Sequence, residues 1–360
     1  MRPAALLLLA VSVPAALAQS ALVVGTVVEA GTVEPLPAAS VFAAGTTRGD
    51  ATDGAGWFAF SVPAPGTADV TATMLGYETA VQRVVVGAGD TVSVSLALRP
   101  VALALAEVDV VEERSAAWHE ALDAFRRQFL GATPNAEATT LANPHVLQLV
   151  AGADTLRAVA TAPLVVRNGA LRYGVVVHDL AFAADGPEWG WDGALSFTDL
   201  CPSPCPDEVR EARRAAYRGS LAHFLRAVAA GRAEAEGFAV ERVARPGAGV
   251  PFLEGVHRLF RPAPSLASVV ERHPWGWSLP VEGALRVVYD RERDPRLHLS
   301  GLSRRPGAGP PQVSWLAVEG GRLDVGPDGV PLDQAAVRRY GYWDWERVAD
   351  LLPLDYEPDE

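Results

Sequence analysis

The seven histidines of this chain are the residues that could bind zinc or act as general bases. They are His119, His145, His178, His223, His257, His273 and His298. A catalytic zinc needs about three protein ligands and one position left open for water. Two of those ligands usually stand close together on one element, as in His-Glu-x-x-His. No such pair occurs here, so the sequence predicts no metallopeptidase, no metal and no cofactor.

Two smaller groupings remain as candidates for acid–base chemistry. Arg218 and His223 fall on a helix predicted over 207–230, but residues five apart do not share a helix face. His223 is a candidate ligand or general base, although a satisfied polar group near the core is the favoured interpretation. His178 and Asp179 are a candidate base and orienting group, yet neighbours on a strand point to opposite faces.

A serine hydrolase would carry Gly-x-Ser-x-Gly at a turn between strand and helix, and the chain has no such motif. Ser220 lies inside the predicted helix, where we expect it to pack as a small residue. Gly307-Ala308-Gly309 is flanked by prolines and predicts a loop that binds no phosphate. We therefore assign no catalytic residue, and the lack of metallopeptidase and serine hydrolase motifs favours a protein that is not an enzyme.

The chain has two cysteines, Cys201 and Cys205, separated by Pro-Ser-Pro. In an oxidising compartment such a pair predicts a disulfide. A redox-active pair is the alternative, although it usually has Cys-x-x-Cys spacing beside a helix N-terminus. A metal pair is a third alternative, but it would lack two ligands.

Two Trp-Gly-Trp motifs, Trp189 to Trp191 and Trp275 to Trp277, are candidates for a sugar-stacking platform. Packing against the protein's own core or edge is the favoured interpretation.

The amino-acid composition excludes some classes of binding partner. The formal net charge is −12, and all 31 basic residues are arginine. Nucleic acid requires a basic patch, so an acidic chain argues against it. A hydrophobic fraction of 49% in 360 residues allows a buried core and about two domains. No run after the first 18 residues is long enough for a transmembrane helix.

The first residues have the order of a signal peptide. Arg2 precedes an apolar run from Ala4 to Leu17, and Ala16-Leu17-Ala18 is a small-x-small cleavage site. We predict cleavage after Ala18 and an exported protein located in the periplasm, at the outer-membrane surface or outside the cell.

Short strands separated by turns predict an all-β sandwich after the signal peptide. Trp57, Phe60 and Tyr77 are the expected core aromatics, and Thr71 is expected to face outward. The predicted strands cover residues 21–29, 40–44, 57–62, 68–74, 79–86 and 91–98.

Five motifs in order carry a resemblance to a known domain. They are Gly25-Thr26-Val27-Val28, Glu34-Pro35-Leu36-Pro37-Ala38-Ala39-Ser40-Val41, Gly45-Thr46-Thr47, Thr52-Asp53-Gly54-Ala55-Gly56-Trp57-Phe58 and Gly76-Tyr77-Glu78. Residues 21–99 thus resemble the carboxypeptidase regulatory-like domain, a transthyretin-like β-sandwich common in secreted Bacteroidota proteins. The resemblance implies fold and secretion, without the catalytic domain that gives the family its name.

The remainder predicts an α+β domain. Residues 113–358 resemble the uncharacterised C-terminal part of short secreted proteins of the same kind, through Thr133-Pro134-Asn135-Ala136, Tyr217-Arg218-Gly219-Ser220-Leu221 and Gly341-Tyr342-Trp343. The expected organisation is a signal peptide at 1–18, a β-sandwich at 19–100, a linker at 101–114 and an α+β domain at 115–360.

Three functions stay open for this organisation. The favoured one is a non-catalytic binding or accessory module of the cell envelope, whose partner is an envelope protein, peptide or glycan. The alternatives are an unrecognised envelope hydrolase with its active site in the second domain, and an accessory protein of an outer-membrane receptor.

Overall fold

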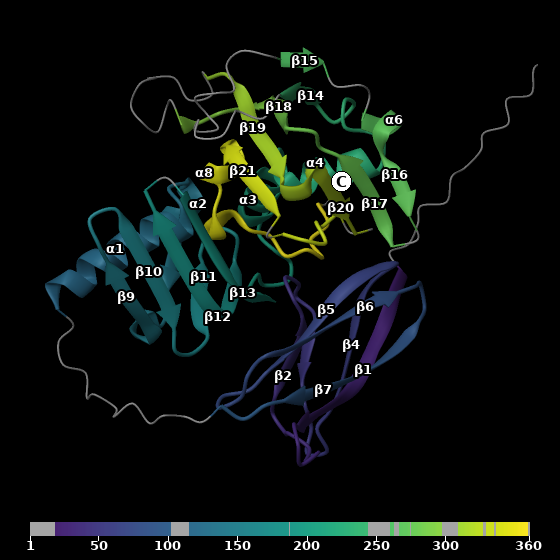
Figure 1. Ribbon diagram of the computed structural model, residues 1–360, viewed down its shortest axis with the longest axis vertical. Helices are drawn as coiled ribbons and strands as arrows, with labels where there is room; N and C mark the ends of the chain where they lie inside the picture. Colours follow the sequence, from purple (N-terminus) through teal and green to yellow (C-terminus); the bar gives the residue numbers. More distant parts are fainter. Residues whose placement is uncertain are drawn as a thin grey trace, which may run out of the picture.

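The computed structural model describes residues 19–101, 115–186, 188–243, 260–262, 266–273, 275–296, 309–326, 329–334 and 336–358. The predicted signal peptide at 1–18 and nearly all of the predicted linker at 101–114 lie outside these ranges, as do His257 and His298. The described residues are mostly β and gather around three hydrophobic clusters. Figure 1 shows the three corresponding bodies, with strands β1 to β7 forming the lower one.

The first body consists of two sheets with a shared core. One sheet has the order β4-β1-β7, in which β1 and β7 are parallel, and the other has the order β3-β2-β5-β6. The core takes residues from both sheets, including Val23, Phe58 and Val70. The strands are β1 Gln19–Glu29, β2 Ser40–Ala43, β3 Gly49–Ala51, β4 Trp57–Ala64, β5 Gly66–Thr73, β6 Ala80–Val86 and β7 Thr91–Leu98.

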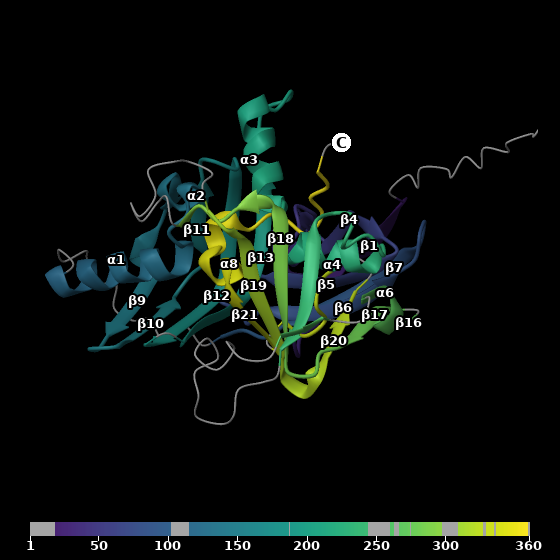
Figure 2. The ribbon, with the colours of Figure 1, turned by 90° about the horizontal axis from the view of Figure 1, so that it is seen from above.

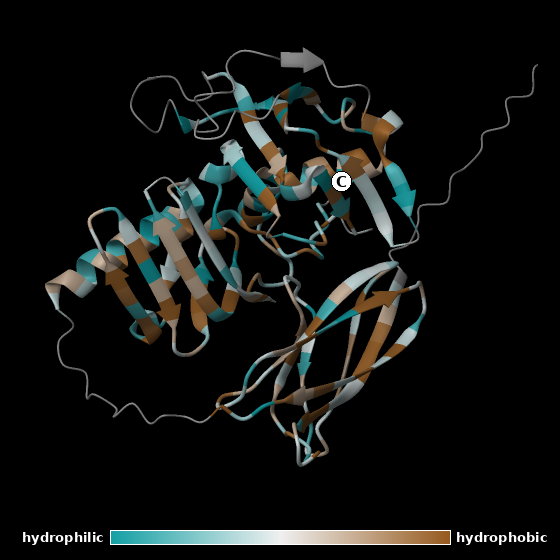
Figure 3. Cartoon of the chain, viewed as in Figure 1, coloured by the Kyte–Doolittle hydropathy of each residue, from teal (hydrophilic) through white to brown (hydrophobic). Residues whose placement is uncertain are grey.

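Alternation along these strands separates core from surface, with two corrections to the expected core. In Figure 3, hydrophobic and hydrophilic segments alternate along the strands of this body. Phe60 is buried as expected, but Trp57 is 46% exposed because it begins β4 after a turn, with its side chain on the outer face. Thr71 is fully buried, contrary to expectation, because Val70, Thr71 and Ala72 are all enclosed where β5 lies between β2 and β6.

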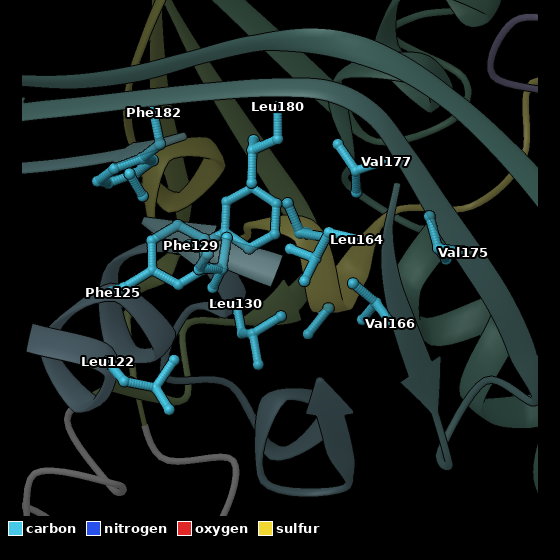
Figure 4. Close-up of a cluster of buried hydrophobic side chains, with 14 of the residues drawn as sticks. Leu122, Phe125, Phe129, Leu130, Leu164, Val166, Val175, Val177, Leu180 and Phe182 are labelled. Carbon is cyan, nitrogen blue, oxygen red and sulfur yellow. The ribbon is translucent and has the colours of Figure 1, made fainter. Parts of the chain in front are cut away.

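The second body packs helix α1 against a bent sheet. Strands β10 and β11 follow one another along β12, which pairs with β13 on its other side. Figure 4 shows Phe125 and Phe129 of α1 pointing into the cluster of valines, leucines and Phe182 from the strands. The elements are α1 Ala116–Leu130, α2 Pro134–Glu137, β8 Thr139–Leu141, η1 Pro144–Val146, β9 Leu147–Ala151, β10 Thr155–Ala160, β11 Leu164–Asn168, β12 Tyr173–Asp185, β13 Glu188–Asp199 and α3 Asp207–Tyr217.

The third body contains a five-stranded sheet of order β15-β14-β18-β19-β21 and a three-stranded sheet of order β16-β17-β20. Helix α4 contributes Phe224 and Leu225 to its core, beside Trp277 and Trp343. Its elements are α4 Leu221–Ala229, β14 Phe238–Val243, β15 Phe260–Pro262, α6 Leu266–Val269, β16 Glu271–His273, β17 Gly276–Pro280, β18 Ala284–Arg293, β19 Pro311–Val318, η3 Glu319–Gly321, β20 Arg322–Val325, β21 Val337–Gly341 and α8 Tyr342–Trp345. The chain then returns to the second body, where η4 Val348–Asp350 joins the core.

The single helix predicted over 207–230 is wrong, because two helices, α3 and α4, meet there with a break between them. Gly219 has φ +78°, a left-handed conformation that glycine adopts without steric cost and that ends a helix. The Ser220 hydroxyl then accepts the backbone N–H of His223 and caps α4. Ser220 is therefore an N-cap and not an interior packing residue, and α3 projects from the body in Figure 2.

Cys201 and Cys205 form a disulfide just before α3. The closed loop is short and already stiffened by two prolines, so we expect reduction to lower the free energy of unfolding by only about 1–2 kcal/mol, below the values for longer loops. Mass spectrometry of the unreduced exported chain should show a mass two hydrogens lower than that of the reduced chain. Two freely alkylated thiols would contradict the pairing.

Backbone contacts attach the first body to the others. The turn between β2 and β3 forms two backbone hydrogen bonds with the edge of β13. Gly45 N donates to Leu195 O (2.6 Å), and Thr46 O accepts from Phe197 N (3.0 Å). The same turn meets a segment that we call the tail, residues 351–358, where Leu354 N donates to Gly45 O (2.8 Å). Gly45 has φ +78°, and a Cβ there would lie 2.7 Å from Leu354 Cδ1. The turn therefore needs glycine at this position.

Candidate functional site

His223 is held in a buried aromatic setting at the start of α4. Its Nδ1 accepts the Gly219 N–H (3.0 Å), so the ring proton lies on Nε2 and is donated to Glu236 (3.0 Å). Tyr217, Phe238 and Tyr289 surround the ring. Burial lowers the pKa of His223, while Glu236 acts in the opposite direction. Because both ring nitrogens form hydrogen bonds within the fold, we interpret His223 as a residue that stabilises the break between α3 and α4.

Arg218 has partners different from those of His223. Its guanidinium pairs with Glu211 (2.6 Å) and Glu292 (2.8 Å). Burial raises the pKa of Glu292, while Arg218 opposes that rise. The arginine thus joins α3 to β18, and the two side chains that the sequence placed on one helix do not share a partner.

His178 lies where the second body meets the first. Its Nδ1 is 3.4 Å from Thr73 Oγ1, and its Nε2 is 3.1 Å from Ser196 Oγ. The Phe42 ring stacks on the imidazole with centroids 4.6 Å apart. Asp179 adopts φ +54° at an irregularity of β12 and is exposed. The candidate pair is therefore not a base with its orienting carboxylate, because hydroxyls and not Asp179 contact the ring nitrogens.

A serine–histidine–glutamate cluster on the three-stranded sheet was not predicted from the sequence. His273 Nε2 lies 3.0 Å from Ser278 Oγ and 4.0 Å from a Glu271 oxygen, while Arg322 donates to Ser278 Oγ (2.7 Å). A working triad orients the histidine through its other nitrogen. Here serine and glutamate meet the same nitrogen, and Ser278 is fully buried. The arrangement is a structural network and not an activated nucleophile.

Asp350 is a partly buried carboxylate that connects α2 to η4. It accepts hydrogen bonds from the Thr133 hydroxyl, the Asn135 amide and the Arg347 backbone N–H. Burial raises the pKa of Asp350 to about 6, although these hydrogen bonds oppose the rise. All its contacts are within the fold, so its role is to position the segment that carries Arg347.

The Trp-Gly-Trp motifs pack mainly against the protein itself. Trp189 donates to Asp344 (2.8 Å), and Trp191 meets Phe129 edge to face. Trp277 is 2% exposed, and Trp275 stacks on His273 at the surface. Neither motif presents two free parallel rings of the kind that a sugar platform requires.

One surface pocket of about 330 Å³ combines charged groups with an aromatic wall. It lies between the C-terminus of α1 and helix α8, where the second and third bodies meet. Three guanidinium groups, one carboxylate and one indole line it, namely those of Arg127, Arg296, Arg347, Asp344 and Trp345. The sequence could not reveal this site, because its arginines belong to distant segments and form no motif. We name it the arginine pocket.

No group of three or more His, Cys, Asp or Glu side chains in the described ranges is placed to hold a metal ion. Over the same residues, no helix is long and apolar enough to cross a membrane. Among the described residues, His178, His223, His273 and Asp350 have structural partners, and the two cysteines are paired. The arginine pocket, which gathers three guanidinium groups beside a carboxylate and an indole, is the candidate functional site.

The two sheets of the first body place it among small all-β domains. Residues 23–110 match the model of the CarboxypepD_reg-like domain, so the chain contains such a domain. No curated protein matches the chain.

Solved structures match parts of the chain. An interface mutant of a type II cohesin–X-dockerin complex from Acetivibrio cellulolyticus has 26% identity and a TM-score of 0.19, over 22% of this chain and 58% of that one. A DUF3823 family protein from Parabacteroides merdae has 12% identity and a TM-score of 0.18, over 51% and 82%. A proposed carbohydrate-binding protein from Bacteroides uniformis has 8% identity and a TM-score of 0.18, over 50% and 99%.

These similarities carry no argument about function, because the TM-scores are low. A second interface mutant of the cohesin–X-dockerin complex also matches, and the two structures are covered over only 58% and 52% of their own chains.

Proposed function

We propose that this protein is an exported, non-catalytic binding module of the cell envelope of a Bacteroidota-type bacterium. In this proposal, residues 19–100 are a transthyretin-like sandwich, residues 101–114 are a linker, and residues 115–360 form an α+β part that binds the ligand. The CarboxypepD_reg-like domain supports an envelope location, since the family that it resembles is common in secreted proteins.

The observation that carries the proposal is the difference between the buried ionisable groups and the arginine pocket. Catalysis by acid and base requires groups that converge on one cavity. His178, His223, Ser278 and Asp350 each contact different structural partners. The pocket instead contains guanidinium groups, which are permanently charged and suit recognition.

The test is binding without turnover. The exported chain is immobilised and exposed to purified envelope proteins, defined envelope glycans and envelope peptides, and each eluted ligand is analysed by mass spectrometry. We expect saturable binding of at least one class, with the ligand recovered unchanged. A product that accumulates with time would overturn the proposal in favour of an envelope hydrolase.

A further inference from the structure

Two arginines of the arginine pocket lack a carboxylate partner in the part of the chain that the structure describes. Arg296 is neutralised by a bidentate ion pair with Asp294, at 2.9 and 2.6 Å. Arg127 is exposed on the last turns of α1 and makes no described ion pair. Arg347 makes no described ion pair either, and its donors go to carbonyl oxygens.

Arg347 lies in a setting where the lack of a carboxylate partner is energetically unfavourable. Its guanidinium lies 3.8 Å from the centroid of the Trp189 ring, and it donates to the carbonyl oxygens of Gln128 and Asp344. Burial lowers the pKa of Arg347, although Asp344 opposes the change. The end of α1 supplies only about half an elementary negative charge. Arg347 is partly buried, and a cation removed from water is normally paired, so the pocket favours an additional anion.

The other groups that line the arginine pocket indicate which chemical groups the anion should carry. Asp344 accepts the Trp189 indole N–H with Oδ1 and can accept a further donor, so a ligand with hydroxyl or amide N–H groups fits better than a bare dianion. Trp345 offers an apolar face, while Gly131 and Gly341 add no side chains to the walls. The volume of about 330 Å³ is at the small end of ligand pockets.

We propose that the arginine pocket binds the carboxylate of a small polar ligand about the size of one sugar ring. Arg127 and Arg347 contact the carboxylate oxygens, Asp344 accepts a hydrogen bond from the ligand, and Trp345 packs against its carbon skeleton. Arginine suits this task because its planar fork matches a carboxylate. This inference depends on the proposed binding function and adds the ligand chemistry to it.

The test compares three probes on the exported chain by isothermal titration calorimetry at constant ionic strength. Glucuronate supplies a sugar carboxylate, N-acetylalanine supplies a peptide-type carboxylate, and glucose supplies none. We expect at least one carboxylate to bind with a Kd below about 10 mM and glucose to bind more weakly. Preference for glucuronate or for N-acetylalanine identifies the source of the carboxylate and supports the site either way. No binding of either carboxylate would overturn the inference.

Arg127→Gln is the decisive variant, because Arg127 makes no described contact that the fold would lose. We expect it to weaken carboxylate binding about tenfold, the effect of one charge-assisted hydrogen bond. The matched control is Arg126→Gln, an exposed neighbour on the same helix that does not line the pocket. Equal effects of the two variants would overturn the inference.

Different results would contradict the binding function and the assignment of the arginine pocket as the binding site. If Arg127→Gln leaves retention of an envelope ligand unchanged, the arginine pocket is not the site, while the binding function stands. If the ligand is converted to product, the binding function fails first.

Discussion

We expect Asp355→Ala to weaken the docking of the first body on the rest of the protein. The Asp355 side chain is 3% exposed and accepts hydrogen bonds from Thr47 N (2.9 Å), Thr47 Oγ1 (2.6 Å) and Arg48 Nε (2.9 Å). Hydrogen bonds to a charged group are stronger than neutral ones, and truncation leaves the Thr47 donors without their partner. The expected loss in docking free energy is about 2–4 kcal/mol.

Hydrogen exchange measures this loss directly. The amides of Gly45 and Phe197 bond across the junction without Asp355, so their protection should fall by about 30- to 1,000-fold in the variant if the first body undocks. Glu357→Ala is the matched control, since it removes an exposed carboxylate from the same tail. Unchanged protection in Asp355→Ala would show that the tail does not hold the first body.

Acidification should weaken the same junction through His178. Burial lowers the pKa of His178 to about 4, although Asp179 opposes the shift. The folded state therefore favours the neutral ring, and this stabilisation is fully present above the ordinary pKa of 6.5. It is lost as the pH falls from 6.5 towards 4, and the loss at pH 5 is about 2 kcal/mol.

The free energy of unfolding at pH 7.5 and pH 5.0 tests this expectation. His178→Phe keeps a ring beside Phe42 and cannot be protonated, so its pH dependence should be smaller than that of the natural chain by about 2 kcal/mol. His119→Gln, a change at an exposed histidine, should leave the pH dependence intact. If His178→Phe and the natural chain lose the same stability on acidification, the histidine is not the responsible group.

The strands of the first body could be predicted well because alternating side chains and turn motifs are local features of the sequence. The strand predicted over 91–98 matches β7, Thr91–Leu98, since period-two alternation and flanking turns fix its ends. Trp57 was misplaced because alternation alone does not show which sheet face is covered. Asp53-Gly54-Ala55-Gly56 correctly marked the turn before it, where Asp53 accepts the Trp57 N–H.

The α3–α4 break and the arginine pocket show two different limits of sequence reasoning. The break had a local signal, because Gly219 followed by Ser220 reads as a helix end and a new N-cap. The strong helix propensity of the surrounding alanines and arginines outweighed it. The pocket had no local signal at all, since Arg127 of α1, Arg296 after β18 and Arg347 after α8 come together only in the folded chain.

The tail contact has a consequence for the timing of folding. Thr47 and Asp355 are 308 positions apart. At about 5–20 residues per second, a ribosome completes Asp355 about 15–60 s after Thr47, which is far longer than a small domain needs to fold. Until then Thr47 and Arg48 lack the Asp355 carboxylate that accepts their hydrogen bonds, and the tail of another copy can bind there. The order of synthesis thus favours exchange of tails between neighbouring chains at high expression, with dimers as the product.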